Sequence, residues 1–259
     1  MKAKFSKLTL VTVALLTLTA CSQSQSSSSK SSTKEESKQT QTKSSKEMSS
    51  AKNPSKETGK EESSKAGKSD VKVDSGVSYN GSYYSVKGKY GEVMIANKHY
   101  PLSPDFNPGE DPEAVSALHE LIAAMQAEGY PISDQYSGFR SYDTQVGLYQ
   151  NYVNQDGQEA ADRYSARPGY SEHQTGLTFD LIDTSGNLVT DPGPSKWLLK
   201  NAAKYGFVVR YQEGKEKVTG YMPESWHLRY IGKEAQDIAD SGLSLEEYYG
   251  FTGGDYVDK

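Results

Sequence analysis

The chain has 259 residues, of which 34% are hydrophobic and 24% are charged, and its formal net charge is −5. That average hides two unlike parts. Residues 1–70 hold 13 lysines against 7 acidic residues, and the remainder holds 16 Lys or Arg against 27 Asp or Glu, so the charges are +6 and −11. An acidic folded part excludes the basic footprint that nucleic-acid binding needs. The one cysteine excludes a disulfide framework.

Residues 1–21 have the layout of an export signal. Three lysines precede an apolar stretch of 13 residues at 8–20, which is too short for a membrane span. The motif LTAC at 18–21 resembles a bacterial lipoprotein box, which implies diacylglyceryl transfer to Cys21 and cleavage just before it. We therefore predict a signal peptide over residues 1–20 and a lipid anchor at Cys21 on the extracellular face of the bacterial cytoplasmic membrane. An ordinary signal peptide that contains a cysteine is the alternative.

Residues 21–76 are predicted to be a disordered, Ser/Lys-rich tether. Between Ser22 and Asp70 there are 17 serines and no Val, Ile, Leu, Phe, Tyr or Trp. Such a stretch cannot bury enough apolar area to offset the entropy of ordering it. As a flexible coil, about 55 residues span roughly 40 Å. The rest of the chain, residues 77–259, is long enough for one domain with its own core.

The first predicted elements of this domain are a hairpin and two helices. The hairpin joins residues 83–86 to 92–95 across a glycine-bearing turn. A helix begins at Asp111, where a capping carboxylate is followed by Pro112, and it ends at Gly129. Ser141 opens the second helix.

The later elements are short. A helix is predicted over 194–204, strands over 177–183, 207–211 and 226–231, and two short helices over 233–249. These helices and short strands do not alternate as βαβ units, and the sequence has no internal repeat. They predict a single α+β domain.

Two of the predicted strands carry groups that can bind a metal. Period-two alternation in 177–183 puts Asp180 on the face opposite Phe179, in the middle of an otherwise apolar strand. A buried carboxylate there needs a cation or several donors. The same alternation in 226–231 sets His227 on the face opposite the apolar residues.

These groups can form a zinc site with His173. Zinc in hydrolases takes three His, Asp or Glu ligands and leaves the fourth position to water, and His173, Asp180 and His227 supply such a set. Glu224, in a loop closed by Pro223, is free to take a proton from that water. On spacing alone the alternative stays open, in which His227 is a core histidine and Asp180 a cap, because no HExxH helix is present.

Three separated motifs carry a resemblance to a known family. They are SGFRSYDTQ at 137–145, SEHQTGLTFD at 171–180 and ESWHLR at 224–229. Together they resemble the VanY-type peptidoglycan carboxypeptidases, zinc metallopeptidases related to D-alanyl-D-alanine dipeptidases, and within them the streptococcal lipoprotein L,D-carboxypeptidases. The resemblance covers roughly residues 92–250. It implies a small antiparallel sheet flanked by helices, with zinc in an open cleft.

The resemblance also implies roles for single residues. His173, Asp180 and His227 match the metal ligands, so the implied cofactor is Zn²⁺. Glu224 matches the catalytic base and Arg140 the arginine that assists the scissile carbonyl. The implied reaction removes the C-terminal D-alanine from peptidoglycan stem peptides, as an L,D-carboxypeptidase that turns tetrapeptides into tripeptides.

Five further residues are expected to bind substrate: Gln145, Ser171, Tyr211, Arg229 and Trp226. For Arg229 the alternative is an ion pair that holds the site together, and for Trp226 it is packing behind the zinc. Three other functions stay open, namely a D,D-carboxypeptidase acting on pentapeptides, a dipeptidase acting on free D-alanyl-D-alanine, and a lipoprotein that binds wall peptides without cutting them. We expect a monomer.

Overall fold

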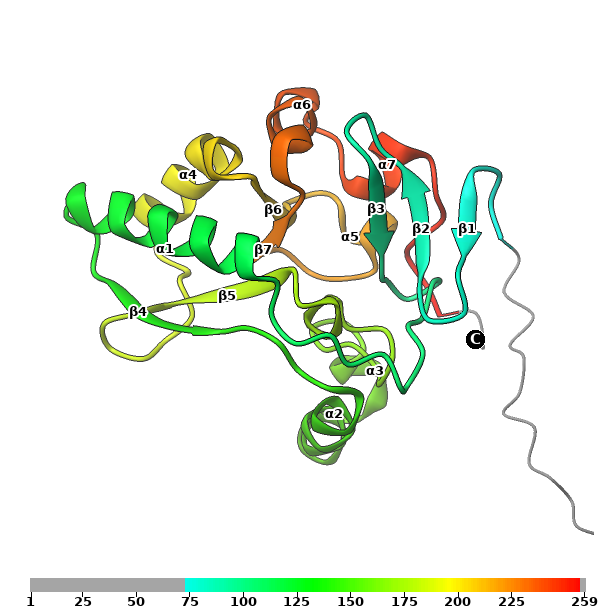
Figure 1. Ribbon diagram of the computed structural model, residues 1–259. Helices are drawn as coiled ribbons and strands as arrows, with labels where there is room; N and C mark the ends of the chain where they lie inside the picture. Colours follow the sequence, from blue (N-terminus) through cyan, green and yellow to red (C-terminus); the bar gives the residue numbers. More distant parts are fainter. Residues whose placement is uncertain (1–72, 257–259) are drawn as a thin grey trace, which may run out of the picture. The chain divides into compact units, whose positions relative to one another are not determined.

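The computed structural model describes residues 73–256. The predicted signal peptide, the lipid site at Cys21 and nearly all of the predicted tether lie outside the described residues. Two antiparallel sheets and the helices around them make up the described part (Figure 1). No helix within residues 73–256 is long and apolar enough to cross a membrane.

The smaller sheet contains β1 (Val77–Tyr79), β2 (Tyr84–Lys87) and β3 (Glu92–Ile95) in chain order. It confirms the predicted hairpin, because β2 and β3 pair antiparallel. The sequence analysis missed β1, which has only three residues and a mostly exposed pattern. Side chains of β2 and β3 pack in one apolar cluster with residues of α6 (Ala235–Ser241) and α7 (Leu245–Tyr249).

The larger sheet has the strand order β4-β5-β7-β6 and is antiparallel throughout. Its strands are β4 (Ile132–Ser137), β5 (Thr178–Asp183), β6 (Phe207–Tyr211) and β7 (Glu224–Tyr230). The last three agree with predicted strands, whereas the partly polar β4 was missed. Strand β7 begins two residues earlier than predicted. Glu224 is therefore its first residue, paired with Tyr211, and the prediction that Glu224 lies in a loop is wrong.

Capping residues set the starts of the long helices. Asp111 accepts a hydrogen bond from the Ala114 amide (2.9 Å) at the start of α1 (Pro112–Ala127), and Ser141 caps α2 (Tyr142–Asp156). The shorter helices are α3 (Gln158–Ala161), α4 (Pro192–Asn201) and α5 (Glu216–Thr219). The 3₁₀ turns are η1 (Glu172–Thr175), η2 (Ala202–Tyr205) and η3 (Gly232–Glu234).

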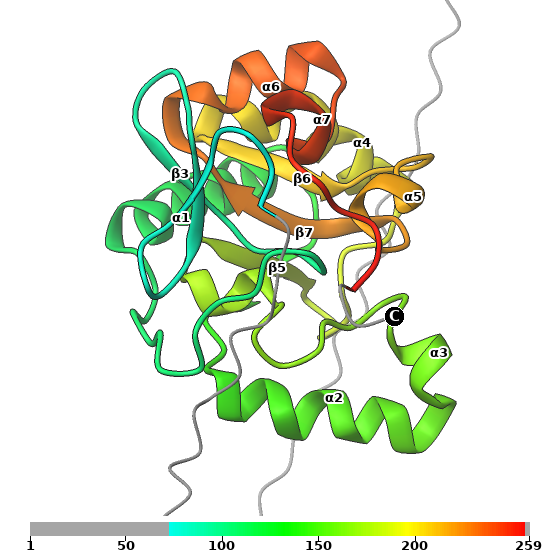
Figure 2. The ribbon, with the colours of Figure 1, turned by 90° about the vertical axis from the view of Figure 1, so that its right-hand side faces the viewer.

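Helices α1 and α4 cover one face of the larger sheet (Figure 1). The main core lies between these two helices and the sheet, and it contains Phe179 and Leu181 of β5 and Leu228 of β7. Because side chains alternate along a strand, Asp180 and His227 project from the opposite face. Figures 1 and 2 show α2 across the molecule from α6 and α7. The two-sheet α+β domain thus has a metal-competent face that these core helices leave open.

Candidate metal centre

Three side chains from different elements converge on the open face of the larger sheet. His173 comes from η1, Asp180 from β5 and His227 from β7, and one ligand atom of each lies within 4.8 Å of the others. Strand pairing places Asp180 directly beside His227. The carboxylate oxygens of Asp180 lie 3.1 Å from His173 Nε2 and 3.2 Å from His227 Nδ1.

Each histidine leaves one ring nitrogen for a metal. Nδ1 of His173 lies 2.8 Å from the carbonyl oxygen of Gly138, which can only accept a hydrogen bond. That nitrogen therefore carries the proton, and Nε2 is left for a metal. His227 is arranged the other way round, because its Nε2 lies 3.3 Å from a carboxylate oxygen of Glu172 and its Nδ1 faces Asp180.

The triad fits a zinc ion. His173 Nε2 and Asp180 Oδ1 are buried and form no hydrogen bond, although each lies within 3.2 Å of a polar atom of the triad. Buried polar atoms nearly always form one. A cation between His173 Nε2 and Asp180 Oδ1 would satisfy both atoms. Two imidazoles and a carboxylate, with room for water, form one of the donor sets of catalytic zinc.

The electrostatics of the site favour a positive charge at the same point. Burial and the nearby charge of Arg140 lower the pKa of His173, so this ligand stays neutral. Burial also lowers the pKa of His227, but three neighbouring carboxylates outweigh burial and raise it. They belong to Asp180, Glu172 and Glu224. Since those carboxylates stabilise either a proton or a metal ion, the two compete for the site.

Glu224 and Arg140 stand beside the triad. An oxygen of Glu224 lies 3.3 Å from His227 Nδ1, and burial raises the pKa of its carboxyl more than His227 lowers it. A buried carboxylate with a raised pKa is suited to general-base work. Arg140 lies 3.8 Å from the Asp180 carboxylate, and its buried Nε has no hydrogen-bond partner. Its guanidinium is thus available to a ligand.

A cavity of about 310 Å³ opens onto the triad. Four of the expected substrate-binding residues line it: Gln145, Ser171, Tyr211 and Trp226. Gln145 is buried, with its Nε2 donating to the Ala166 carbonyl (2.7 Å) and its Oε1 unpartnered. The Tyr211 ring contacts the His227 ring at 4.6 Å between centroids. Trp226 lines the cavity and also packs against the core, as its alternative interpretation held; its contact with substrate stays a prediction.

The fifth expected substrate residue, Arg229, lies elsewhere. It is buried behind His227, where its guanidinium contacts Glu172 at 3.3 Å and donates to the Met94 carbonyl at 2.6 Å. Arg229 thus takes part in an ion pair, as its alternative interpretation held. Sequence reasoning missed Glu172 itself, whose only signal was its place next to His173 in the SEHQTG motif.

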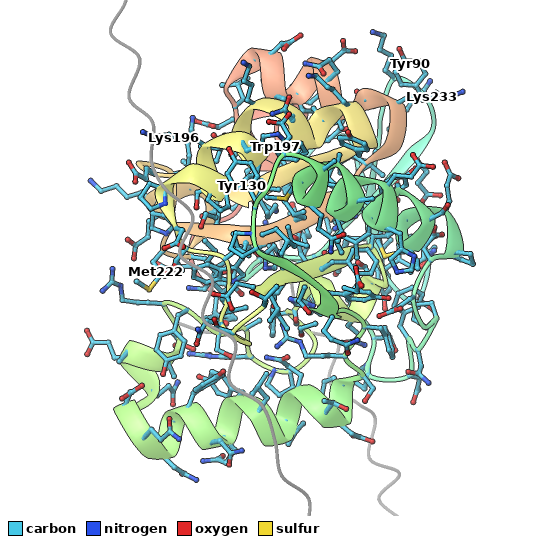
Figure 3. All side chains as sticks on the ribbon, turned by 90° about the vertical axis from the view of Figure 1, so that its left-hand side faces the viewer. Tyr90, Tyr130, Lys196, Trp197, Met222 and Lys233 are labelled. Atoms are coloured by element: carbon cyan, nitrogen blue, oxygen red, sulfur yellow. The ribbon has the colours of Figure 1, made fainter. Side chains whose placement is uncertain are left out.

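A second cavity of about 590 Å³ adjoins the first. The two share Tyr211, Pro223 and Trp226, which form the wall between them. Met222 lines the first cavity and Lys196 the second, and Figure 3 shows both side chains on one side of the molecule, reaching outward. The two cavities are thus neighbours that share one wall beside the metal site.

Known proteins share this architecture. Residues 109–233 match the family model VanY, D-alanyl-D-alanine carboxypeptidase. The crystal structure of the L,D-carboxypeptidase DacB from Streptococcus pneumoniae is 70% identical, with a TM-score of 0.69, over 70% of this chain and 98% of that chain. A vancomycin resistance D,D-pentapeptidase VanY, solved with Zn(II), is 31% identical, with a TM-score of 0.53, over 60% of this chain and 96% of that chain. Putative carboxypeptidase YodJ of Bacillus subtilis is 36% identical over 61% of this chain, and the match spans 66% of YodJ.

Proposed function

The chain belongs to the VanY family of carboxypeptidases, and from this we propose that it is a zinc-dependent enzyme that removes the C-terminal D-alanine from peptidoglycan stem peptides. One observation carries the proposal. The ligand atoms of His173, Asp180 and His227 lie within 4.8 Å of one another at a cavity that also contains Glu224 and Arg140. Ligands, base and a cationic donor are thus present in one cavity.

Glu224 and Arg140 have different roles in the proposed hydrolysis. A zinc ion, when bound, would polarise the scissile carbonyl and lower the pKa of the attacking water. Glu224 takes the proton of that water and then delivers it to the departing D-alanine nitrogen, so that the C–N bond breaks as a neutral amine leaves. Arg140 donates hydrogen bonds to the developing oxyanion, a contribution of about 3 kcal/mol for one such donor.

The cavity provides donors for the carboxylate of the terminal D-alanine. Ser171 is buried in its wall. Gln145 Nε2 donates to the Ala166 carbonyl at 2.7 Å and to the Ser165 hydroxyl at 3.5 Å, and it can exchange the longer of these two bonds for the substrate. A folded part with a charge of −11 repels an anion in general, so the carboxylate depends on such local donors. The second cavity, on the other side of Tyr211 and Trp226, is the space we assign to the rest of the stem peptide.

We further propose an L,D preference, with tetrapeptides as substrates and tripeptides as products. The support is the 70% identity to a protein named as an L,D-carboxypeptidase, against 31% to one named as a D,D-pentapeptidase. D,D-cleavage of pentapeptides is the competing reaction. Both reactions use the same triad and base, and they differ in the configuration of the residue before the scissile bond.

The test is to incubate the purified protein with tetrapeptide and pentapeptide muropeptides and to weigh the products by mass spectrometry. We expect loss of one alanine from the tetrapeptide. Release from the pentapeptide alone would overturn the L,D preference. Zinc binding without release from either substrate would favour a non-catalytic wall-peptide-binding protein.

We also propose that Cys21 carries a lipid and holds the domain, as a monomer, near the wall on the extracellular face of the membrane. The support is the LTAC motif after the apolar stretch at 8–20. Radiolabelled fatty acid should enter the wild-type protein in cells and not the Cys21→Ser variant, which should appear in the medium. Light scattering of the purified protein tests the monomer.

A further inference from the structure

Four charged side chains are buried side by side behind the metal ligand His227. They are Glu172, Arg210, Arg229 and Glu246, and each side chain is 1–2% exposed. Two carboxylates and two guanidiniums give the group a net charge of zero. Because removing one member of a buried charge network leaves another uncompensated, the four residues depend on one another.

Glu172 connects this network to the metal site. One of its carboxylate oxygens lies 3.3 Å from His227 Nε2. The other accepts hydrogen bonds from Arg210 Nε at 2.8 Å and from Arg229 at 3.3 Å. The His227 ring thus has the Glu172 carboxylate at Nε2, while its Nδ1 faces Asp180, the second residue of the triad. A carboxylate that accepts from the far nitrogen of a metal-binding histidine fixes both its tautomer and its ring orientation.

The network then reaches two segments outside residues 109–233, the part that matches the family model. Arg210 Nη1 donates to the Glu246 carboxylate on α7 at 2.8 Å. Arg229 donates to the carbonyl of Met94 on β3 at 2.6 Å. Glu246 also accepts from the side chain of Asn97, just after β3, at 3.1 Å. Each guanidinium that contacts Glu172 is therefore anchored at its other end by a flanking segment.

We propose that Glu172 is a positioning residue for the metal ligand His227, and that α7 and β3 hold Glu172 in place through Arg210 and Arg229. The inference rests on the proposed function only in requiring that the triad binds zinc. In this arrangement the small sheet and the C-terminal helix support the metal site, although neither contributes a ligand.

The first test uses the wild-type chain loaded with zinc, so that no variant has to fold. Nitrogen NMR of the histidine rings should show His227 bound through Nδ1 with its proton on Nε2, and His173 the reverse. Metal bound at Nε2 of His227 would overturn the proposal, because Glu172 would then have no ring proton to accept. A wild-type chain that binds no zinc contradicts the proposed function instead.

The second test measures zinc affinity by competition with a chelator. Loss of a partner behind a metal ligand costs about 10- to 100-fold in affinity, so we expect that loss for Glu172→Gln and a smaller one, about 3- to 10-fold, for Glu246→Gln. Glu247→Gln is the matched control. Glu247 is the next residue on α7, it is partly exposed, and it pairs with Lys215 at 2.7 Å. Gln preserves the capping role of Glu247. The zinc affinity of the Glu247→Gln variant should therefore equal that of the wild type.

A cooperative unfolding transition shows which variants fold. If Glu246→Gln does not fold, Glu246→Asp replaces it, because Asp keeps the charge and withdraws the carboxylate from Arg210. Wild-type affinity in the folded variant at position 246 would contradict the coupling to α7. Because such a variant would still bind zinc tightly, this outcome would not contradict the proposed function.

Discussion

At the scale of single residues, Glu224 is buried and contacts His227 of the triad, although it is not itself a member of the triad. Its carboxylate lies 3.3 Å from His227 Nδ1, and burial raises its pKa. We expect Glu224→Gln, which preserves the shape of the side chain, to lower kcat by about 10²- to 10⁴-fold because the proton acceptor is lost. Zinc content measured on the same sample should be unchanged. Retained turnover would show that another group is the base.

Arg140 is the residue to which we assign stabilisation of the developing oxyanion. Its guanidinium borders the triad at 3.8 Å from Asp180 and keeps an unpartnered Nε. Arg140→Ala should lower kcat by about 10²- to 10³-fold, the usual loss of one oxyanion donor. KM for the tetrapeptide should change much less, since an interaction made only in the transition state does not alter ground-state binding. A rise in KM with unchanged kcat would assign Arg140 to substrate binding instead.

At the scale of elements, η1 depends on the glycine that ends it. Gly176 has φ of 75°, its amide donates to the carbonyl of His173 at 3.3 Å, and a Cβ there would overlap the carbonyl oxygen of Gly109. Gly176→Ala should lower the free energy of unfolding by more than the ~1–2 kcal/mol of a left-handed alanine. It should also weaken zinc binding, because the turn carries His173.

Gly129, after α1, gives the matched control for that substitution. Its φ is 86°, and a Cβ there would meet nothing within 4 Å. Gly129→Ala therefore measures the conformational cost alone, by urea unfolding, and should leave zinc affinity unchanged. Equal destabilisation by the two substitutions would show that η1 can shift away from Gly109.

Asp162 joins α2 to the segment after α3. Its carboxylate accepts from the Tyr149 hydroxyl at 2.7 Å and from Arg167 at 2.8 Å. Burial raises the pKa of Asp162, but these hydrogen bonds outweigh burial and lower it. A lowered folded-state pKa adds stability above the unfolded pKa of about 3.9, and that stability is lost as the pH falls toward the folded value.

Asp162→Asn should therefore be less stable than the wild type at pH 7, and the difference should shrink as the pH falls below 4. Urea unfolding at pH 7, 5 and 3 measures it. Asp237→Asn, in the exposed pair with Lys89, is the control and should change stability little at any of these pH values. A difference independent of pH would mean that Asp162 acts through packing.

At the scale of the whole molecule, the proposed zinc ion would join distant parts of the chain. The three ligands come from η1, β5 and β7, so the site exists only when the larger sheet is formed. Free zinc at 100 times its Kd should add about 2.7 kcal/mol to the free energy of unfolding. Chelation should accordingly lower Tm and abolish activity, and added zinc should restore both. Glu224→Gln should show the same Tm shift, whereas His227→Ala should show none.

Local features of the fold could be predicted from the sequence because their causes are local. Asp111 and Ser141 cap helices with their own side chains, and the hairpin of β2 and β3 closes over a few residues. Strand β4 was missed because its partly polar residues lack the alternation that marks a half-buried strand. It is a strand because β5 pairs with it.

The sequence by itself determined which residue types can bind zinc, and strand alternation placed Asp180 and His227 on the faces where the structure has them. Only the tertiary structure decided which groups meet. Glu172 contacts residues 38, 55 and 57 positions away, and no local pattern distinguishes it from an exposed glutamate. The reason is physical. Alternation and capping follow from the backbone geometry of neighbouring residues, whereas the partner of a buried charge is chosen by the packing of whole elements.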